Sequence, residues 1–150
     1  MKKVRRLEPA DDRSAFRSGN ADHDRFFHRY AGQEEFLQQI GTTYVAVDDA
    51  ERILGFATVI GSEIAGAPKT PALPVLRLAR LAVDRRATGT GVARRLLNAT
   101  LELALRIDQS VGCEGIVVDA RLDEVPFYER LGFILLEAAV MFVELGSVPY

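Results

Sequence analysis

The segment that most constrains the fold is an apolar run that leads directly into a basic, glycine-bearing turn and then into a helical pattern. The apolar run covers residues 75–83, the turn covers residues 84–91, and the helical pattern follows at once. A strand, a turn whose glycines leave backbone N–H groups uncovered, and a helix N-terminus together form an anion site. This order of elements predicts an α/β arrangement with an anion-binding turn.

The turn itself narrows the class of anion. It lacks the Gly-Lys-Ser/Thr ending of a nucleoside-triphosphate loop and the Gly-x-Gly-x-x-Gly order of a dinucleotide fingerprint. Gly89 and Gly91 remain, and they allow the backbone to approach a ligand closely. Arg86, with Arg85, adds positive charge at the positive end of the helix dipole. The pattern suits a pyrophosphate bound without a metal; the alternative is a plain strand–helix turn with its arginines in solvent.

Composition limits the class of protein. A chain of 150 residues with a formal net charge of −2 is expected to form one soluble domain, residues 1–150, and gives no global reason to bind nucleic acid. Cys113 is the only cysteine, which favours a reduced, cytoplasmic setting. The basic start is followed by acidic residues and Pro9 instead of an apolar core, and no apolar run reaches the ~20 residues of a membrane helix. We therefore expect neither a signal peptide nor a membrane span.

Periodicity predicts one mixed α/β (α+β) unit. Residues 21–39 have helical spacing, with Asn20 or Asp22 as the cap and Gly32 as a break, and the proline-bearing residues 61–74 are expected to form a loop. The expected strands are residues 4–7, 42–47, 53–60, 76–83, 115–120, 133–136 and 140–145, and the further helices are residues 89–107 and 124–131.

A second stretch with possible chemistry is residues 127–133, a short helical pattern that ends at Gly132. It contains Tyr128, and an unperturbed phenol, with a pKa of ~10, is protonated at neutral pH. Tyr128 could therefore donate a proton to a leaving thiolate. The alternative is a core aromatic with its hydroxyl at the rim.

Together, the turn and Tyr128 resemble the GNAT superfamily of acyl-CoA-dependent N-acyltransferases. In that family the pattern Arg/Gln-x-x-Gly-x-Gly/Ala after a central strand holds the coenzyme A pyrophosphate, and here it is Arg86, Gly89 and Gly91 after RLARLAVD. The resemblance implies a central mixed sheet of about six to seven strands flanked by about four helices, and acetyl-CoA as cosubstrate. It implies that Tyr128 donates to the thiolate and that backbone groups of Leu81 and Val83 pair with the pantetheine amides. The pyrophosphate would be held by Arg86, Thr88, Gly89, Thr90, Gly91, Val92 and Ala93.

Four longer segments resemble the branch that contains the acetyltransferase toxins of toxin–antitoxin pairs. They are AFRSGNADHDRFFHRYAGQ, TYVAVDDAERILGF, PVLRLARLAVDRRATGTGVARRLL and VVDARLDEVPFYERLGF. The resemblance implies aminoacyl-tRNA as the acceptor and a ribbon-helix-helix antitoxin as partner. The stretch from Asn20 to Gln39 is, however, net acidic by count, whereas a tRNA acceptor stem favours basic surfaces. A small-molecule or protein amine, or a non-catalytic acyl-CoA-binding relative, therefore stays open.

No general base is evident from the sequence. Glu63 is a weak candidate, since a charge at a strand end is ordinarily solvated, and a water chain would serve equally well. We expect Asp119 to end a strand, and His23 and His28 to lie on the exposed side of the first helix. No cluster of His, Cys and Asp has metal-ligand spacing, so no metal is expected. A homodimer through the C-terminal strand, residues 140–145, is also expected.

Overall fold

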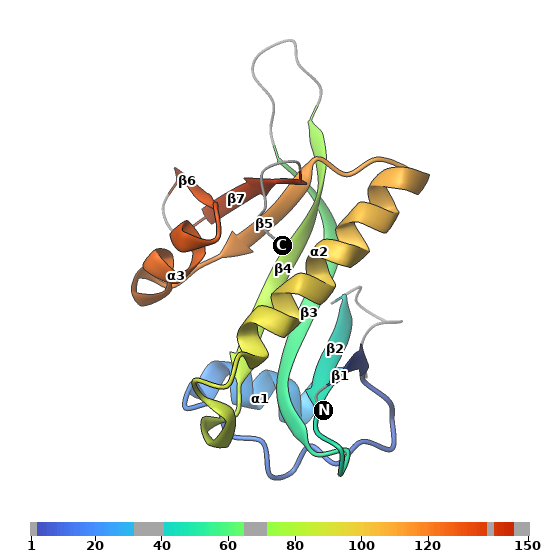
Figure 1. Ribbon diagram of the computed structural model, residues 1–150, viewed down its shortest axis with the longest axis vertical. Helices are drawn as coiled ribbons and strands as arrows, with labels where there is room; N and C mark the ends of the chain where they lie inside the picture. Colours follow the sequence, from blue (N-terminus) through green and yellow to red (C-terminus); the bar gives the residue numbers. More distant parts are fainter. Residues whose placement is uncertain (1–2, 32–40, 65–71, 138–139, 146–150) are drawn as a thin grey trace. The chain divides into compact units, whose positions relative to one another are not determined.

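The computed structural model describes residues 3–31, 41–64, 72–137 and 140–145. Seven strands form one mixed sheet in the order β1-β2-β3-β4-β5-β7-β6 (Figure 1). The strands are β1 (Lys3–Arg6), β2 (Thr42–Val47), β3 (Ile53–Ile64), β4 (Leu73–Val83), β5 (Gly115–Asp119), β6 (Ile134–Glu137) and β7 (Val140–Glu144). The predicted mixed α/β class and strand succession are confirmed.

The helices are fewer than the sequence predicts. Within the described ranges there are three α-helices and two short 3-10 turns, compared with about four expected helices. They are α1 (Ala21–Arg29), η1 (Arg85–Ala87), α2 (Val92–Ser110), η2 (Leu122–Glu124) and α3 (Val125–Arg130). The second half of the predicted first helix, residues 32–40, lies outside the described residues.

Strand pairing explains which edges the sheet exposes. Strands β1, β2 and β3 pair antiparallel in sequence order, β4 and β5 pair in parallel, and β7 pairs antiparallel with both β5 and β6. The sheet therefore ends at β1 and β6, and β7 is occupied on both sides. The expected dimer contact at residues 140–145 cannot be edge-to-edge strand pairing through β7.

The chain divides into two compact units. The first unit is Met1–Ile60 with Arg80–Ala99, and the second unit is Gly61–Ala79 with Thr100–Tyr150. The expectation of a single domain stays a prediction. In neither unit does a described helix have the length and apolar character needed to cross a membrane.

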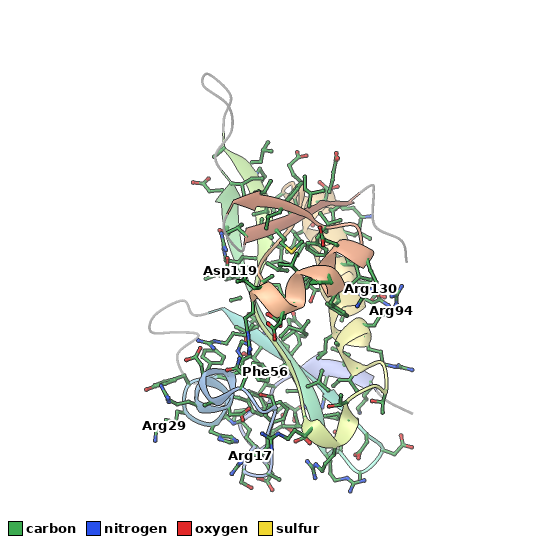
Figure 2. All side chains as sticks on the ribbon, turned by 90° about the vertical axis from the view of Figure 1, so that its left-hand side faces the viewer. Arg17, Arg29, Phe56, Arg94, Asp119 and Arg130 are labelled. Carbon is green, nitrogen blue, oxygen red and sulfur yellow. The ribbon has the colours of Figure 1, made fainter. Side chains whose placement is uncertain are left out.

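The core of the first unit is an aromatic cluster beneath α1. The Phe27 ring stacks on Phe56 with centroids 4.5 Å apart, and Phe16 meets Phe27 at 4.8 Å and Phe56 at 5.5 Å. Phe56 comes from β3 and is labelled in Figure 2. Of the two predicted caps, Asn20 is the one that caps α1, because its side-chain oxygen accepts hydrogen bonds from two backbone N–H groups of the first turn. The cap and the aromatic cluster together fix where α1 begins and which face it buries.

The core of the second unit is built on β5 and β7. Ile116, Val117 and Val118 of β5 are fully buried, as are Met141 and Val143 of β7. The buried side chains of α2 recur at helical spacing and fall in both units; they are Val92, Leu96, Leu97, Thr100, Leu101 and Ala104. These positions form one face of α2, and Leu105 at its edge is half-buried.

Candidate functional site

The turn between β4 and α2 has the open geometry that an anion site requires. Gly89 has φ +77° and Gly91 has φ +84°, in the left-handed region that favours glycine. A Cβ atom placed on either glycine would meet nothing within 4 Å. The glycines therefore leave open space beside the backbone, where a ligand can approach.

Backbone N–H groups of the turn and of the start of α2 are the donors available at this site. The N–H of Ala87 donates to the Asp84 carbonyl at 2.9 Å and the N–H of Thr90 donates to the Ala87 carbonyl at 3.2 Å, which tightens the turn. Beyond it, the first N–H groups of α2, which begins at Val92, have no acceptor within the helix. The helix dipole adds partial positive charge at the same end. The turn can therefore bind an anion through backbone groups alone.

Asp84 holds the turn in place, and sequence reasoning missed it. This side chain is 1% exposed. Its Oδ1 accepts from the backbone N–H and Nε of Arg86, both at 2.9 Å, and its Oδ2 accepts from Arg86 Nη2 at 3.2 Å and from the Arg17 N–H at 3.0 Å. Burial raises the pKa of Asp84, but the hydrogen bonds from Arg86 and Arg17 outweigh burial and leave that pKa below its usual value. The only signal in the sequence was an aspartate closing the strand two residues before Arg86.

Arg86 therefore differs from the free cation that the sequence predicts. Its guanidinium is 57% exposed but already paired with Asp84, and the hydrogen bond to that carboxylate raises the pKa of Arg86. Because the carboxylate balances much of its charge, Arg86 contributes mainly to the shape of the turn. Its contact with a pyrophosphate stays a prediction.

Strand β4 offers free backbone at the expected place. Its pairing with β5 ends at Leu78 and Val118, although β4 continues to Val83. Leu81 and Val83 lie in this extension and are half-buried. On that side their backbone groups are not used in the β4–β5 ladder. A ligand with amide groups could pair there as an added strand.

Tyr128 lies in α3, in the second unit. It is 4% exposed, and its ring meets Phe127 at 5.1 Å and Phe133 at 5.3 Å, both edge-on. Burial raises the pKa of Tyr128, and the nearby charge of Glu124 raises it further. The phenol therefore stays protonated at any physiological pH. Because the turn belongs to the first unit, its combination with Tyr128 in one site stays a prediction.

The candidate bases have ordinary surroundings. Glu63 is exposed on β3, and Asp119 ends β5, as expected, where it pairs with Arg77 at 2.6 Å. The exposed positions predicted for His23 and His28 are wrong, because both are half-buried. Arg80 Nη1 lies 3.2 Å from His23 Nδ1, and His28 Nε2 lies 3.1 Å from a guanidinium nitrogen of Arg17. These side chains face the body of the unit because α1 packs its aromatic side onto β3. In the described part of the chain, no group of His, Cys, Asp and Glu could hold a metal ion.

Comparison with known proteins gives one consistent family. The acetyltransferase (GNAT) domain family matches residues 12–150. A tRNA-acetylating toxin of Mycobacterium tuberculosis is 30% identical over 138 residues, which is 86% of this chain and 82% of the toxin.

Solved structures of toxins share the fold. One is a mutant of the toxin AtaT bound to the C-terminus of the antitoxin AtaR and acetyl-CoA, with a TM-score of 0.87, 25% identity, and coverage of 98% of this chain and 95% of that chain. Another is the KacTA–DNA complex, with a TM-score of 0.85, 25% identity and the same coverage of 98% and 95%.

Proposed function

Because the chain belongs to the GNAT acetyltransferase family, we propose that it transfers the acetyl group of acetyl-CoA to the amino group of aminoacyl-tRNA. The N-acetyltransferase activity and its dependence on acetyl-CoA follow from the family. The choice of acceptor is carried by one observation, the 30% identity to a tRNA-acetylating toxin over 86% of the chain. A toxin of this type arrests growth by blocking the amino group that translation needs.

The donor half of the reaction uses the turn and β4. The N–H groups of Gly89 and residues 91–93 and the helix dipole of α2 bind the pyrophosphate of acetyl-CoA. The N–H groups of Thr88 and Thr90 already donate to carbonyls of the turn. Backbone groups of Leu81 and Val83 pair with the pantetheine amides and direct the thioester along β4. The open space beside Gly89 and Gly91 supports this assignment, since any larger residue would fill it.

The chemical step is direct attack. The amine nitrogen adds to the thioester carbonyl, a C–N bond forms and the C–S bond breaks. The thiolate takes the proton of the Tyr128 phenol, and the amine loses its own proton to water. Water then returns a proton to the Tyr128 phenolate, so the net products are the acetylated amine and free CoA thiol. The raised pKa keeps Tyr128 protonated but makes the phenol a weaker acid, so it donates only once a strongly basic thiolate develops. Much of the acceleration then comes from positioning the two reactants.

An antitoxin is the proposed partner. The related AtaT is solved with the C-terminus of the antitoxin AtaR, and we propose a ribbon-helix-helix antitoxin for this chain as well. A short reading frame of that type beside this gene would support the assignment. Co-expression should then restore growth that the enzyme alone arrests. A homodimer remains part of the proposal, and light scattering on the purified protein would test it.

The experiment that tests the function compares acceptors with labelled acetyl-CoA. Charged tRNA should be acetylated, whereas deacylated tRNA, free amino acids and lysine-containing peptides should not. Acetylation of free amines at a similar kcat/KM would favour a small-molecule or protein amine as the acceptor. If no amine is acetylated while acetyl-CoA still binds, the chain is a non-catalytic relative.

Tyr128→Phe tests the proposed proton donor. The variant should keep the KM for acetyl-CoA and lose roughly 10²-fold or more in kcat, the usual contribution of a positioned acid. Tyr44→Phe, a half-buried tyrosine on β2, is the control and should match wild type. An unchanged kcat for Tyr128→Phe would remove the phenol from the mechanism.

A further inference from the structure

The acidic residues of α1 are engaged within the first unit. The Asp22 carboxylate accepts from Arg80 Nη1 at 2.9 Å. Asp24 Oδ1 accepts from the Ser18 N–H at 3.0 Å and from the Ser18 hydroxyl at 2.7 Å. A count of charges made α1 unfavourable for RNA, but Asp24 is hydrogen-bonded to Ser18, and the charge of Asp22, whose side chain is 72% exposed, is balanced by Arg80. These contacts weaken that objection.

In contrast to these acidic residues, three exposed arginines of the same unit are not paired with any described side chain of opposite charge. Arg17, Arg29 and Arg85 are exposed, and among the described residues none of them forms an ion pair with a carboxylate. Other arginines of the first unit do: the pairs are Arg5–Asp11, Arg52–Asp48, Arg80–Asp22 and Arg86–Asp84. Among the described residues, the exposed Arg25 and Arg94 form no ion pair with a carboxylate either, so the unbalanced positive charge of this unit includes these two side chains as well.

We call these three residues the arginine cluster: Arg17 and Arg85 are hydrogen-bonded to each other, and Arg29 follows a residue that Arg17 contacts. The Arg85 N–H donates to the Arg17 carbonyl at 2.9 Å, and the Arg85 guanidinium lies over Gly19, where Nε would be 3.1 Å from an added Cβ. Arg17 Nη1 lies 3.1 Å from His28 Nε2, and Arg29 is the next residue on α1. Figure 2 labels Arg17 and Arg29 at the periphery of the first unit.

One member of the arginine cluster is already ordered. Arg17 Nη1 donates to the carbonyls of Phe16 at 2.7 Å and Ser14 at 3.0 Å, which fixes the guanidinium plane and leaves its other nitrogens for a ligand. Guanidinium groups bind phosphate oxygens in a bidentate manner. A pre-ordered side chain loses less conformational entropy when it does so. This arrangement fits phosphates spaced along a backbone.

We propose that the arginine cluster binds the phosphate backbone of the tRNA acceptor arm, an inference that rests on the proposed function. Arg85 directly precedes Arg86 of the pyrophosphate turn, so the cluster would dock the RNA beside the donor site. Phosphate contacts position a nucleic acid without reading its sequence. The cluster therefore sets affinity and orientation, and the aminoacyl end provides the chemistry.

The test is tRNA binding by the double variant Arg17→Gln/Arg29→Gln, measured by filter binding over a range of salt concentrations. Each phosphate contact contributes a slope of about 0.8 in log K against log salt, which is about fivefold in affinity at ~0.15 M. Loss of two contacts should weaken binding about 20-fold and reduce the slope by about 1.6. The KM for acetyl-CoA should not change.

Two control variants test whether loss of any surface arginine, or a structural role of Arg17, explains weaker tRNA binding. Arg52→Gln/Arg121→Gln removes two exposed arginines that already pair with Asp48 and Asp123, and it should keep both affinity and slope. Arg17→Lys keeps the charge but not the bidentate guanidinium, so it should keep the salt slope of wild type and bind tRNA with an affinity between those of wild type and Arg17→Gln. A purely structural role of Arg17 would leave Arg17→Lys no better than Arg17→Gln. Equal melting temperatures would show that all variants fold.

The outcomes separate this proposal from the proposed function. If wild type acetylates charged tRNA but Arg17→Gln/Arg29→Gln keeps its affinity and salt slope, the docking proposal is wrong and the function stands. If wild type binds tRNA through these arginines but acetylates no charged tRNA, the function fails and the surface stands. A raised KM for acetyl-CoA would assign the cluster to the donor instead. Loss of antitoxin binding with unchanged tRNA binding would make it a protein-docking surface; both results overturn the proposal.

Discussion

Replacing Asp84 by asparagine should loosen the turn between β4 and α2, for which we propose pyrophosphate binding. The buried carboxylate accepts four hydrogen bonds, two on each oxygen, from Arg17 and Arg86. An asparagine amide has a single acceptor oxygen, and its NH2 group must face donors on the other side. Two of the four hydrogen bonds are therefore lost in either orientation.

The magnitude follows from which bonds are lost. In either orientation one lost bond involves a backbone N–H and the other involves the Arg86 guanidinium, which is 57% exposed and can turn to water. The backbone bond to a charged acceptor is worth about 1.5–3 kcal/mol, and the exposed bond adds little. We expect a loss of about 2–3 kcal/mol in the free energy of unfolding. For a chain of this size that lowers Tm by roughly 4–12 °C.

Thermal melts and acetyl-CoA kinetics would check this prediction together. Asp84→Asn should melt lower and raise the KM for acetyl-CoA by roughly tenfold, about 1.4 kcal/mol. Asp123→Asn, whose side chain is 70% exposed, is the control and should change stability by less than about 0.5 kcal/mol. A variant that melts within a degree of wild type and binds acetyl-CoA equally well would refute the role given to Asp84.

The pH dependence of stability gives a second readout of Asp84. Its pKa in the folded protein lies below the unfolded value of ~3.9. The stabilisation is thus fully present above the unfolded value and is lost as pH falls through the folded pKa. Wild type should lose its advantage over Asp84→Asn in that acidic range. A constant difference between the two proteins down to the folded pKa would contradict this.

Two further predictions concern the turn and the thiol. Gly91→Ala should raise the KM for acetyl-CoA and lower stability by about 1–2 kcal/mol, because alanine is strained at φ +84°. Gly61→Ala is the control and should be neutral, since Gly61 also has open space for a Cβ but no positive φ. Equal effects of the two substitutions would refute the argument from backbone geometry. Cys113 is 4% exposed, and burial raises its pKa, so the native thiol should react with a disulfide reagent only on unfolding; rapid reaction in native buffer would contradict its burial.

Local patterns predicted the elements well because their causes are local. Strand β2 has the bounds that the sequence predicts, residues 42–47. Its β-branched and aromatic residues favour a strand, and a turn sequence follows it. Helix α2 was expected from residue 89 but begins at Val92, because Gly89 and Gly91 adopt positive φ and cannot start a regular helix. The boundary was missed because glycine can adopt either sign of φ, so the sequence alone does not show which one it takes.

Features that depend on distant residues were not predictable. The histidines of α1 were expected to face solvent, but packing of Phe27 on Phe56 rotates that face toward β3. Asp84 was not recognised because its partner, the Arg17 N–H, is 67 residues away in the chain. The charge of α1 was judged from a count, whereas the ion pair Arg80–Asp22 balances one of the counted carboxylates. Each miss required knowledge of a tertiary contact.

The hydrogen bond between Asp84 and the Arg17 backbone has a consequence for transplanting the donor site. A short segment transplanted into another protein would carry the glycines and arginines of the turn. It would lack the Arg17 N–H group, and Asp84 would lose that hydrogen bond. Bringing Arg17 and Asp84 together closes a long loop, which costs conformational entropy. Packing of the core around Phe16 offsets that cost. Removal of the segment before α1 should therefore abolish acetyl-CoA binding, although that segment contains no residue of the pyrophosphate turn.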